Sequence, residues 1–193
     1  MENILGFISP GILSQILVGL SRTVILFIVS SGLSLILGVL RIPNVAHGSL
    51  YMIGAFMAYT VSHLFGGGTA GFWMALILAP LGVAALSFIA ERGLFQFLYE
   101  REHLMLLLLT FALSLVFGDL VKLIWGAEYR SVPVPSMFQG YINLFGGLPF
   151  PIYSFFLLVT GPVIAVLLWL LTNKTKIGKI SRAAAVDREM VGA

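Results

Sequence analysis

The chain has 193 residues, of which 59% are hydrophobic and 10% are charged. Soluble domains carry roughly 25% charged residues, so this composition excludes a water-soluble globular protein and indicates an integral membrane protein. The net charge of +3 does not indicate nucleic-acid binding, because the few basic residues gather at the ends of apolar segments, where membrane orientation explains them. The absence of cysteine excludes a disulfide framework, a thiolate metal site and a cysteine nucleophile.

Hydropathy predicts about five membrane spans, which belong to one membrane domain over residues 1–193. A helix needs ~20 apolar residues to cross a hydrocarbon core of ~30 Å. The predicted spans are 12–39, 45–65, 70–90, 104–125 and 151–172. We expect all of them to be α-helices, because the runs are too continuously apolar for the alternating pattern of a membrane barrel. The first run exceeds one crossing, so we expect it to tilt or to break at residues 30–32.

Basic residues near the span ends predict the orientation of the chain. If five spans alternate, most lysines and arginines fall on one side: Arg41, Arg92, Arg101, Lys174, Lys176, Lys179, Arg182 and Arg188. The positive-inside rule then places the amino terminus outside and the carboxyl end in the cytoplasm. The external connection 126–150 contains three prolines and a glycine pair, which predict a long irregular loop.

A polar motif follows the first predicted span. Pro43 is expected to end one helix, and Asn44 to cap the next by accepting a hydrogen bond from an otherwise unpaired amide. Capping does not explain His47, which lies one turn into a membrane segment, where a neutral imidazole needs a partner or a water-filled path. A structural cap and a functional site both remain open from these residues alone.

Asp119 and Lys122 lie three residues apart in an apolar segment. We expect them to pair on one helix face, which lowers the cost of their charges near lipid; a role in transport is the alternative. Gly54 and Ala58 form a small-xxx-small pair that favours close helix packing.

After the fifth predicted span the composition becomes polar and rich in alanine, which favours a helix but not a crossing. At 100° per residue, Ile180, Ala184 and Val191 share a narrow apolar stripe, whereas Arg182 and Glu189 lie on a charged one. We expect a short amphipathic helix on the cytoplasmic face. It either lies on anionic lipid or docks on a partner protein.

Signatures of enzymes are absent from the sequence. The histidines have no HExxH spacing, and neither a Gly-x-Ser-x-Gly elbow nor a phosphate-binding Gly-x-x-x-x-Gly-Lys loop occurs. We therefore expect a protein that is not an enzyme and that holds no cofactor or metal.

Three separated stretches, in order, resemble one family. The run at 38–55 contains Gly-Val-Leu-Arg, Asn-Val-Ala-His-Gly and Tyr-Met-Ile-Gly-Ala, and it resembles the amino-terminal signature of permease subunits of ABC importers for branched-chain amino acids. Residues 109–114, with 123–126, are similar to the family's fourth helix, and 130–133 to the loop after it. Residues 178–190 resemble its cytoplasmic coupling loop. Together these stretches extend the similarity over nearly the whole chain.

The resemblance implies an all-α permease with about five transmembrane helices and a short cytoplasmic coupling helix, in the bacterial inner membrane. It implies a second permease subunit, ABC ATPase subunits and an external solute-binding protein as partners, with ATP hydrolysis on a separate chain. The implied cargo is leucine, isoleucine or valine, although urea and short amides use similar permeases. The residues placed at the translocation interface are Asn44, His47 and Gly48. The residues assigned to ATPase coupling within 178–193 are Arg182, Ala184, Asp187 and Glu189.

The sequence also departs from the family pattern. Family members continue for about another hundred residues, enough for ~3 more crossings, whereas this chain ends within the coupling segment. We therefore expect an amino-terminal fragment that does not transport by itself. Two other classes fit the sequence less well. An intramembrane hydrolase using His47 lacks an accompanying nucleophile motif, and a self-sufficient channel has no need of residues 178–190.

Overall fold

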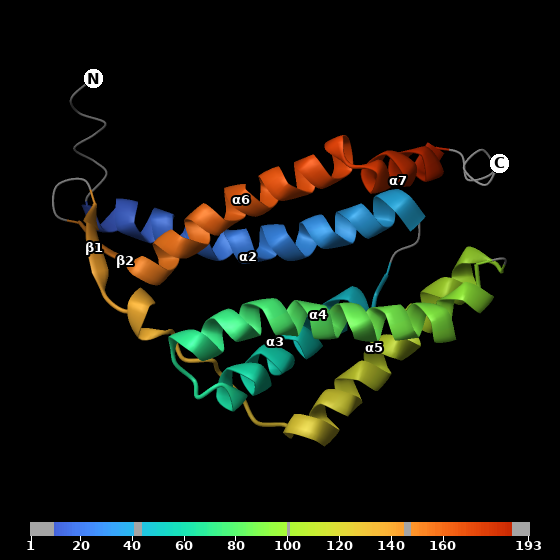
Figure 1. Ribbon diagram of the computed structural model, residues 1–193, viewed down its shortest axis with the longest axis horizontal. Helices are drawn as coiled ribbons and strands as arrows, with labels where there is room; N and C mark the ends of the chain where they lie inside the picture. Colours follow the sequence, from blue (N-terminus) through green and yellow to red (C-terminus); the bar gives the residue numbers. More distant parts are fainter. Residues whose placement is uncertain (1–9, 41–43, 100, 145–147, 187–193) are drawn as a thin grey trace. The chain divides into compact units, whose positions relative to one another are not determined.

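The computed structural model describes residues 10–40, 44–99, 101–144 and 148–186 (Figure 1). In chain order the elements are α2 (Pro10–Leu40), α3 (His47–Leu64), α4 (Thr69–Gly93), η1 (Phe95–Phe97), α5 (His103–Trp125), η2 (Ser136–Phe138), β1 (Tyr141–Leu144), β2 (Leu148–Pro151), α6 (Ile152–Lys174) and α7 (Lys176–Val186). The chain divides into two compact units. We call residues 40–136, with α3, α4 and α5, the central unit, and residues 1–39 with 137–193 the terminal unit.

Within the described residues, four helical segments are long and apolar enough to cross a membrane. They are Ile12–Gly38, Thr69–Phe97, His103–Trp125 and Ile152–Lys174. These segments coincide with four of the five predicted spans and confirm an all-α integral membrane protein. The remaining predicted span, 45–65, forms α3, whose 18 residues reach about 27 Å at ~1.5 Å per residue. A crossing by α3 stays a prediction, because this helix is shorter and more polar than the other four.

The first helix, α2, is continuous from Pro10 to Leu40, so the alternative of a break at residues 30–32 is wrong. Pro10 suits a first helical position, because its fixed φ fits the helix and its missing amide would have no partner there. At Ser31 the hydroxyl donates to the Ile28 carbonyl oxygen at 2.8 Å, so this polar side chain is satisfied without opening the helix. The 31 residues of α2 reach about 46 Å, and a tilt is the remaining way to fit them into a bilayer.

The predicted irregular loop contains an antiparallel pair of strands, β1 and β2, which corrects that expectation for residues 141–144 and 148–151. Tyr141 pairs with Pro151 and Asn143 with Pro149. Residue pairs in an antiparallel ladder alternate between hydrogen-bonded and non-hydrogen-bonded pairs. The two prolines are two residues apart, so both can lie in non-hydrogen-bonded pairs, where the missing proline N–H costs no hydrogen bond. The Ile152 amide donates to the Gly140 carbonyl at 3.2 Å and continues the alternation. The prolines indicated a turn in the sequence, but a two-stranded ribbon accommodates them.

In the central unit, α3 and α4 form a closely packed helical hairpin. A Cβ atom added to Gly71 would lie 2.6 Å from the carbonyl oxygen of Ser62, which is closer than real Cβ atoms approach. Further along, Gly54 faces Val83 and Gly82 faces the sulfur of Met57. Small residues therefore let the two helices approach, as the sequence predicted for Gly54.

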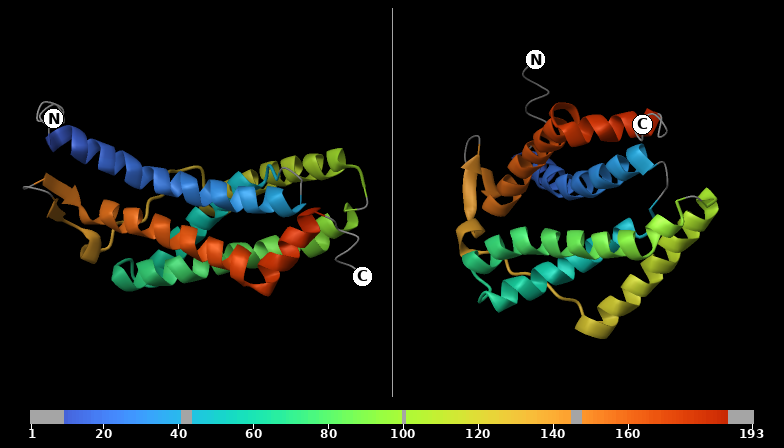
Figure 2. Two further views of the ribbon diagram at one scale, coloured as in Figure 1. Left: turned by 90° about the horizontal axis from the view of Figure 1, so that it is seen from above. Right: turned by 45° about the vertical axis from the view of Figure 1, so that its right-hand side comes forward.

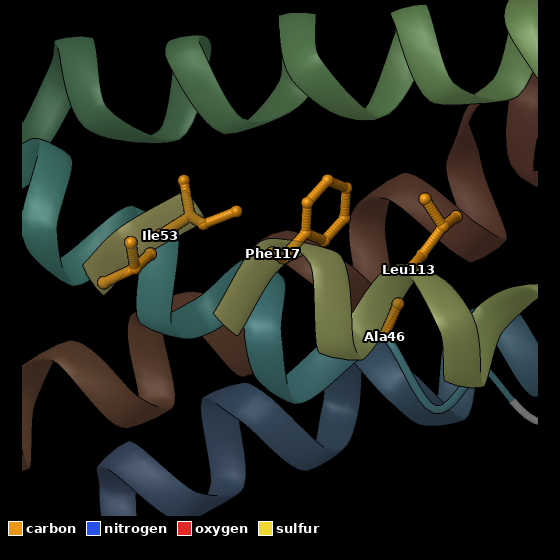
Figure 3. Packing of buried hydrophobic residues seen from close by; sticks show 5 residues of the cluster. Ala46, Ile53, Leu113 and Phe117 are labelled. Carbon is orange, nitrogen blue, oxygen red and sulfur yellow. The ribbon is translucent and has the colours of Figure 1, made fainter. Parts of the chain in front are cut away.

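The other partner of α3 is α5, and a cluster of buried apolar side chains lies between them (Figure 3). Its buried members are Ala46, Ile53, Leu113, Phe117 and Val121. Among the spanning segments α5 is the most buried, because it receives side chains from α3 along its length. The segment just before α3, with Ala46, is thereby held against α5.

In the terminal unit, α6 lies alongside α2 (Figures 1 and 2). The two helices meet at Gly161, where an added Cβ would lie 3.0 Å from the methyl groups of Val24. Both helices otherwise expose large apolar side chains, among them Leu26 at 67% and Leu167 at 58%. Such surfaces need lipid or another protein to cover them.

Candidate functional site

Asn44 organises the turn that precedes α3. The Ala46 amide donates to the side-chain oxygen of Asn44 at 3.0 Å, and the His47 amide donates to its main-chain oxygen at 3.2 Å. This arrangement is an Asx turn, in which a short polar side chain binds the backbone two residues on. The predicted bond from an amide to the Asn44 side chain is thus confirmed, although the residue directly before the helix is Ala46.

The Asn44 turn is bonded to α5. The Val45 amide donates to the hydroxyl oxygen of Thr110 at 3.3 Å, across 65 residues of sequence. Thr110 is 1% exposed, and its hydroxyl donates in turn to the Leu107 carbonyl at 2.9 Å. Ala46 is equally buried. The motifs at 44–48 and 109–114, which the sequence presented separately, therefore meet in one place.

We call this place the α3–α5 junction and define it by Asn44, Val45, Ala46, Ser49 and Thr110. Ser49 is buried and donates to the Ala46 carbonyl at 2.9 Å, so every hydroxyl at the junction is satisfied. The sequence alone did not indicate the roles of Ser49 and Thr110. The available signal was a hydroxyl side chain at 110 within an otherwise leucine-rich helix, inside a stretch already noted.

His47 and Gly48 lie at the edge of the junction, on the first turn of α3. His47 is half-buried, whereas Gly48 is exposed, and an added Cβ at Gly48 would meet no atom within 4 Å. Packing inside the described chain thus gives no reason for glycine at 48. The open space beside the Gly48 backbone lets another group approach closely. Within the described residues, no three histidine or acidic side chains are grouped so as to hold a metal ion.

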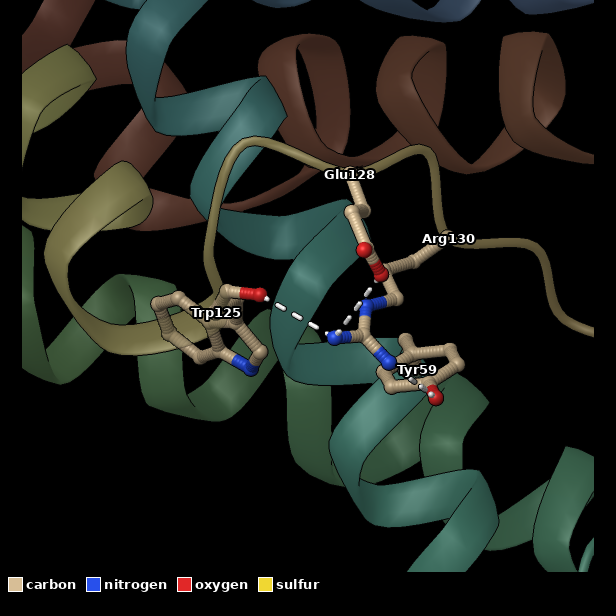
Figure 4. Close-up of polar contacts among 4 residues, drawn as sticks. All are labelled: Tyr59, Trp125, Glu128 and Arg130. Atoms are coloured by element: carbon tan, nitrogen blue, oxygen red, sulfur yellow. Dashed lines mark hydrogen bonds and ion pairs between the residues drawn. The ribbon is translucent and has the colours of Figure 1, made fainter.

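A second set of polar contacts joins the other ends of α3 and α5 (Figure 4). The Trp125 indole nitrogen donates to the Thr60 hydroxyl at 2.7 Å. The Arg130 guanidinium donates to the Trp125 carbonyl at 3.3 Å and to the Tyr59 hydroxyl at 3.4 Å, and its central carbon lies 5.7 Å from the Tyr59 ring centroid. Glu128 approaches Arg130 only at 3.9 Å and is largely exposed, so this ion pair contributes little. Tyr59 and Thr60 were missed from the sequence.

The bonds at the two ends have the same sequence offset. Val45 to Thr110 and Thr60 to Trp125 each span 65 residues, so α3 and α5 run parallel and in register. Thr110 and Trp125 are separated by 15 residues of helix, or about 22 Å. Sequence reasoning could not find this register, because it depends on which side chains meet after folding.

The predicted ion pair on α5 is present. Lys122 Nζ lies 3.1 Å from Asp119 Oδ1, and their side chains are 67% and 79% exposed. Because α5 is long and apolar enough to cross a membrane, the pair lowers the cost of placing either charge where this face meets lipid. Its effect is to bring two opposite charges together on an otherwise apolar helix face, as the sequence predicted.

The residues assigned to coupling are only partly described. The helix starts at Lys176, earlier than the predicted 179, and is described to Val186. Arg182 turns back toward α6, where its guanidinium donates to the Asn173 side-chain oxygen at 2.6 Å. Ile180 is 56% exposed. The side chain of Ala184, and Asp187, Glu189 and Val191 as a whole, lie outside the described residues.

The chain was compared with models of protein families, with individual known proteins and with solved structures. The model of the family described as branched-chain amino acid transport system / permease component matches residues 15–193. The chain is 23% identical over 185 residues to the high-affinity branched-chain amino acid transport system permease protein BraD of Pseudomonas aeruginosa, covering 92% of this chain. It spans 60% of the length of that relative. No solved structure matches the chain.

Proposed function

Because the chain belongs to the family of permease components of branched-chain amino acid transport systems, we propose that it is a permease subunit of an ATP-driven importer in the bacterial inner membrane. The cargo is leucine, isoleucine or valine. The subunit pairs with a second permease subunit and works with ABC ATPase subunits and an external solute-binding protein. ATP hydrolysis takes place on the ATPase chains, and this chain supplies part of the translocation path.

The observation that carries the proposal is the α3–α5 junction. Asn44, His47 and Gly48 line the cytoplasmic end of the translocation interface. Buried bonds from Asn44 and Thr110 fix the backbone there, while His47 stays half-buried and Gly48 leaves space beside its backbone. A fixed backbone with an ionisable side chain just inside a helix suits a site where a polar solute or a partner chain passes closely.

The proposed topology has five crossings, with the amino terminus outside and the carboxyl end in the cytoplasm. Parallel register supports a crossing by α3, because α3 follows α5 over about 22 Å between the two bonded ends. A helix that accompanies a spanning helix over this length traverses most of a hydrocarbon core of ~30 Å. The count of basic residues supports the direction.

Cysteine labelling tests the topology, since these 193 residues contain no cysteine and a single introduced one is therefore unique among them. Exposed positions suit the purpose: Ala70→Cys and Ser136→Cys should react with an impermeant reagent from outside, and Gln96→Cys only from the cytoplasm. Labelling of the first two sites only from the cytoplasm defeats the proposed orientation.

Uptake measurements test the function. Uptake is measured in a longer version of the chain, extended to the full length of its relatives. In this longer background, His47→Ala and Asn44→Ala should reduce uptake of labelled leucine although the protein is present in the membrane at normal abundance. Asn44→Ser is the matched control, because its hydroxyl can still accept a turn amide. Unchanged uptake in both alanine variants would rule out the role in transport and leave the turn before α3 as the only role of these residues. Competition by urea or a short amide, without competition by isoleucine or valine, would overturn the assigned cargo.

A further inference from the structure

A single residue separates α6 from α7. Thr175 has an extended backbone, with φ −93° and ψ 158°, which ends α6 at Lys174. Its hydroxyl oxygen accepts the Gly178 amide at 3.1 Å and donates to the Leu171 carbonyl at 2.5 Å. The Thr175 carbonyl also accepts the Lys179 amide at 3.1 Å. Thr175 therefore caps α7 while remaining bonded to the last turn of α6.

Gly178 brings the first turn of α7 directly against the backbone of α6. Gly178 is buried, and an added Cβ would lie 2.6 Å from the Thr172 carbonyl carbon and closer still to the carbonyl oxygens of Leu171 and Thr172. Relief of such a contact requires the two backbones to separate. Any larger residue at 178 therefore opens the angle between α6 and α7.

Arg182 lies four residues after Gly178, on the same face of α7. Its guanidinium donates to the Asn173 side-chain oxygen at 2.6 Å. The Asn173 amide nitrogen donates to the Trp169 carbonyl at 3.1 Å, which holds the oxygen toward Arg182. The bond is charge-assisted and short, but it lies at an exposed position, so it sets the direction of the side chain more than it adds to stability. This bond ties α7 to the last turn of α6 at a second point, beyond Gly178.

We propose that Arg182 is a positioning residue that, together with Asn173, Thr175 and Gly178, holds α6 and α7 as one rigid corner. Without these contacts a single extended residue between two helices is a hinge, and a hinge absorbs motion instead of transmitting it. With them, a displacement of α7 moves α6 as well. The consequence for transport rests on the proposed function, whereas the rigidity of the corner does not. Arg182 acts within this chain, and its effect does not depend on direct contact with an ATPase.

Pulsed electron paramagnetic resonance tests the corner in the 193-residue chain itself. Spin labels are attached to Val166→Cys in α6 and Ala183→Cys in α7, two exposed positions that would be the only cysteines of the 193-residue chain. The labels report the distance across the corner in lipid nanodiscs. We expect one narrow distance distribution for the otherwise unchanged protein. Arg182→Ala and Asn173→Ala should each broaden it, and the double variant should broaden it no further, because both single changes remove the same bond.

Three further variants sharpen the test. Asn173→Asp keeps an acceptor for Arg182 and should retain the narrow distribution. Lys179→Ala removes an exposed basic side chain from the same helix and should also leave it unchanged. Gly178→Ala should shift the mean distance, whereas Gly19→Ala, whose added Cβ meets no atom within 4 Å, should not. If Arg182→Ala leaves the distribution narrow, or if Lys179→Ala broadens it equally, the positioning role is wrong.

Uptake in the longer background separates this proposal from the proposed function. Arg182→Ala and Asn173→Ala should lower uptake by the same factor and retain ATPase co-purification, since the docking surface stays but its motion is lost. A loss in Arg182→Ala with normal uptake in Asn173→Ala would assign Arg182 to a partner contact and overturn the rigid corner. If the longer protein does not transport leucine even without a substitution, the proposed function fails. The distance distributions of the 193-residue chain still show whether the corner between α6 and α7 is rigid.

Discussion

Replacing Thr110 with valine preserves the shape of a side chain that is 1% exposed but removes the oxygen that accepts the Val45 amide at 3.3 Å. The substitution also removes the hydroxyl that donates to the Leu107 carbonyl, but this carbonyl lies within α5 and keeps its helical hydrogen bond. The cost therefore comes from the Val45 amide. The bond is only partly buried, so we expect a loss of about 1 kcal/mol rather than the ~3 kcal/mol of a sealed unpaired group.

Amide hydrogen exchange measures this bond directly. A loss of about 1 kcal/mol corresponds to roughly fivefold faster exchange at Val45, if exchange follows local opening of the junction. Thr110→Ser is the matched control, because it loses a methyl group but keeps the hydroxyl, and it should leave exchange at Val45 close to that of the unchanged protein. Equal acceleration in both variants, or none in Thr110→Val, would refute the reasoning that this hydroxyl holds the turn before α3.

Three other predictions follow from packing, polar contacts and coupling. Gly71→Ala should lower the free energy of unfolding by about 1–3 kcal/mol, measured by detergent titration with tryptophan fluorescence, because its Cβ collides with a carbonyl of α3; an equal loss in Gly118→Ala, where space is open, would contradict this. Trp125→Phe should cost about 1 kcal/mol, and adding Thr60→Val should cost little more, because both changes remove the same 2.7 Å bond; additive losses of the two single variants would contradict this. Ala184→Arg, in the longer background, should abolish uptake and ATPase co-purification but not membrane insertion; retention of both would favour a lipid-anchoring helix.

The helices were largely predictable because apolar runs have clear ends. The predicted spans 104–125 and 151–172 differ from α5 and α6 by two residues or fewer at each end. For α4 the predicted end at 90 falls short of Gly93, since hydropathy marks where the apolar run stops, while Glu91 and Arg92 continue the helix. The pairing of β1 with β2 was not predicted, because prolines in a sequence indicate a turn. Only knowledge of the partner strand shows that they lie where a strand tolerates them.

The candidate site was predictable only in pieces. Asn44 was assigned a capping bond from local chemistry, and this bond is present because it needs only the next few residues. The bond from Val45 to Thr110 depends on the packing of α3 against α5, which no local pattern specifies. Likewise, a helical projection placed Arg182 on a charged stripe but could not show that Gly178 brings this face against α6.

The two bonded ends of α3 and α5 restrict how these helices can move. A sliding motion of α3 along α5 by one turn, about 5.4 Å, would have to break the Val45–Thr110 and Thr60–Trp125 bonds together, since both lie on the same register. Rotation of α3 about its own axis would withdraw Ile53 from Phe117 and open the apolar cluster between them. Shear and rotation inside the pair are therefore both disfavoured. A conformational change of the central unit that keeps these contacts must therefore tilt α3 and α5 together, as one rigid body.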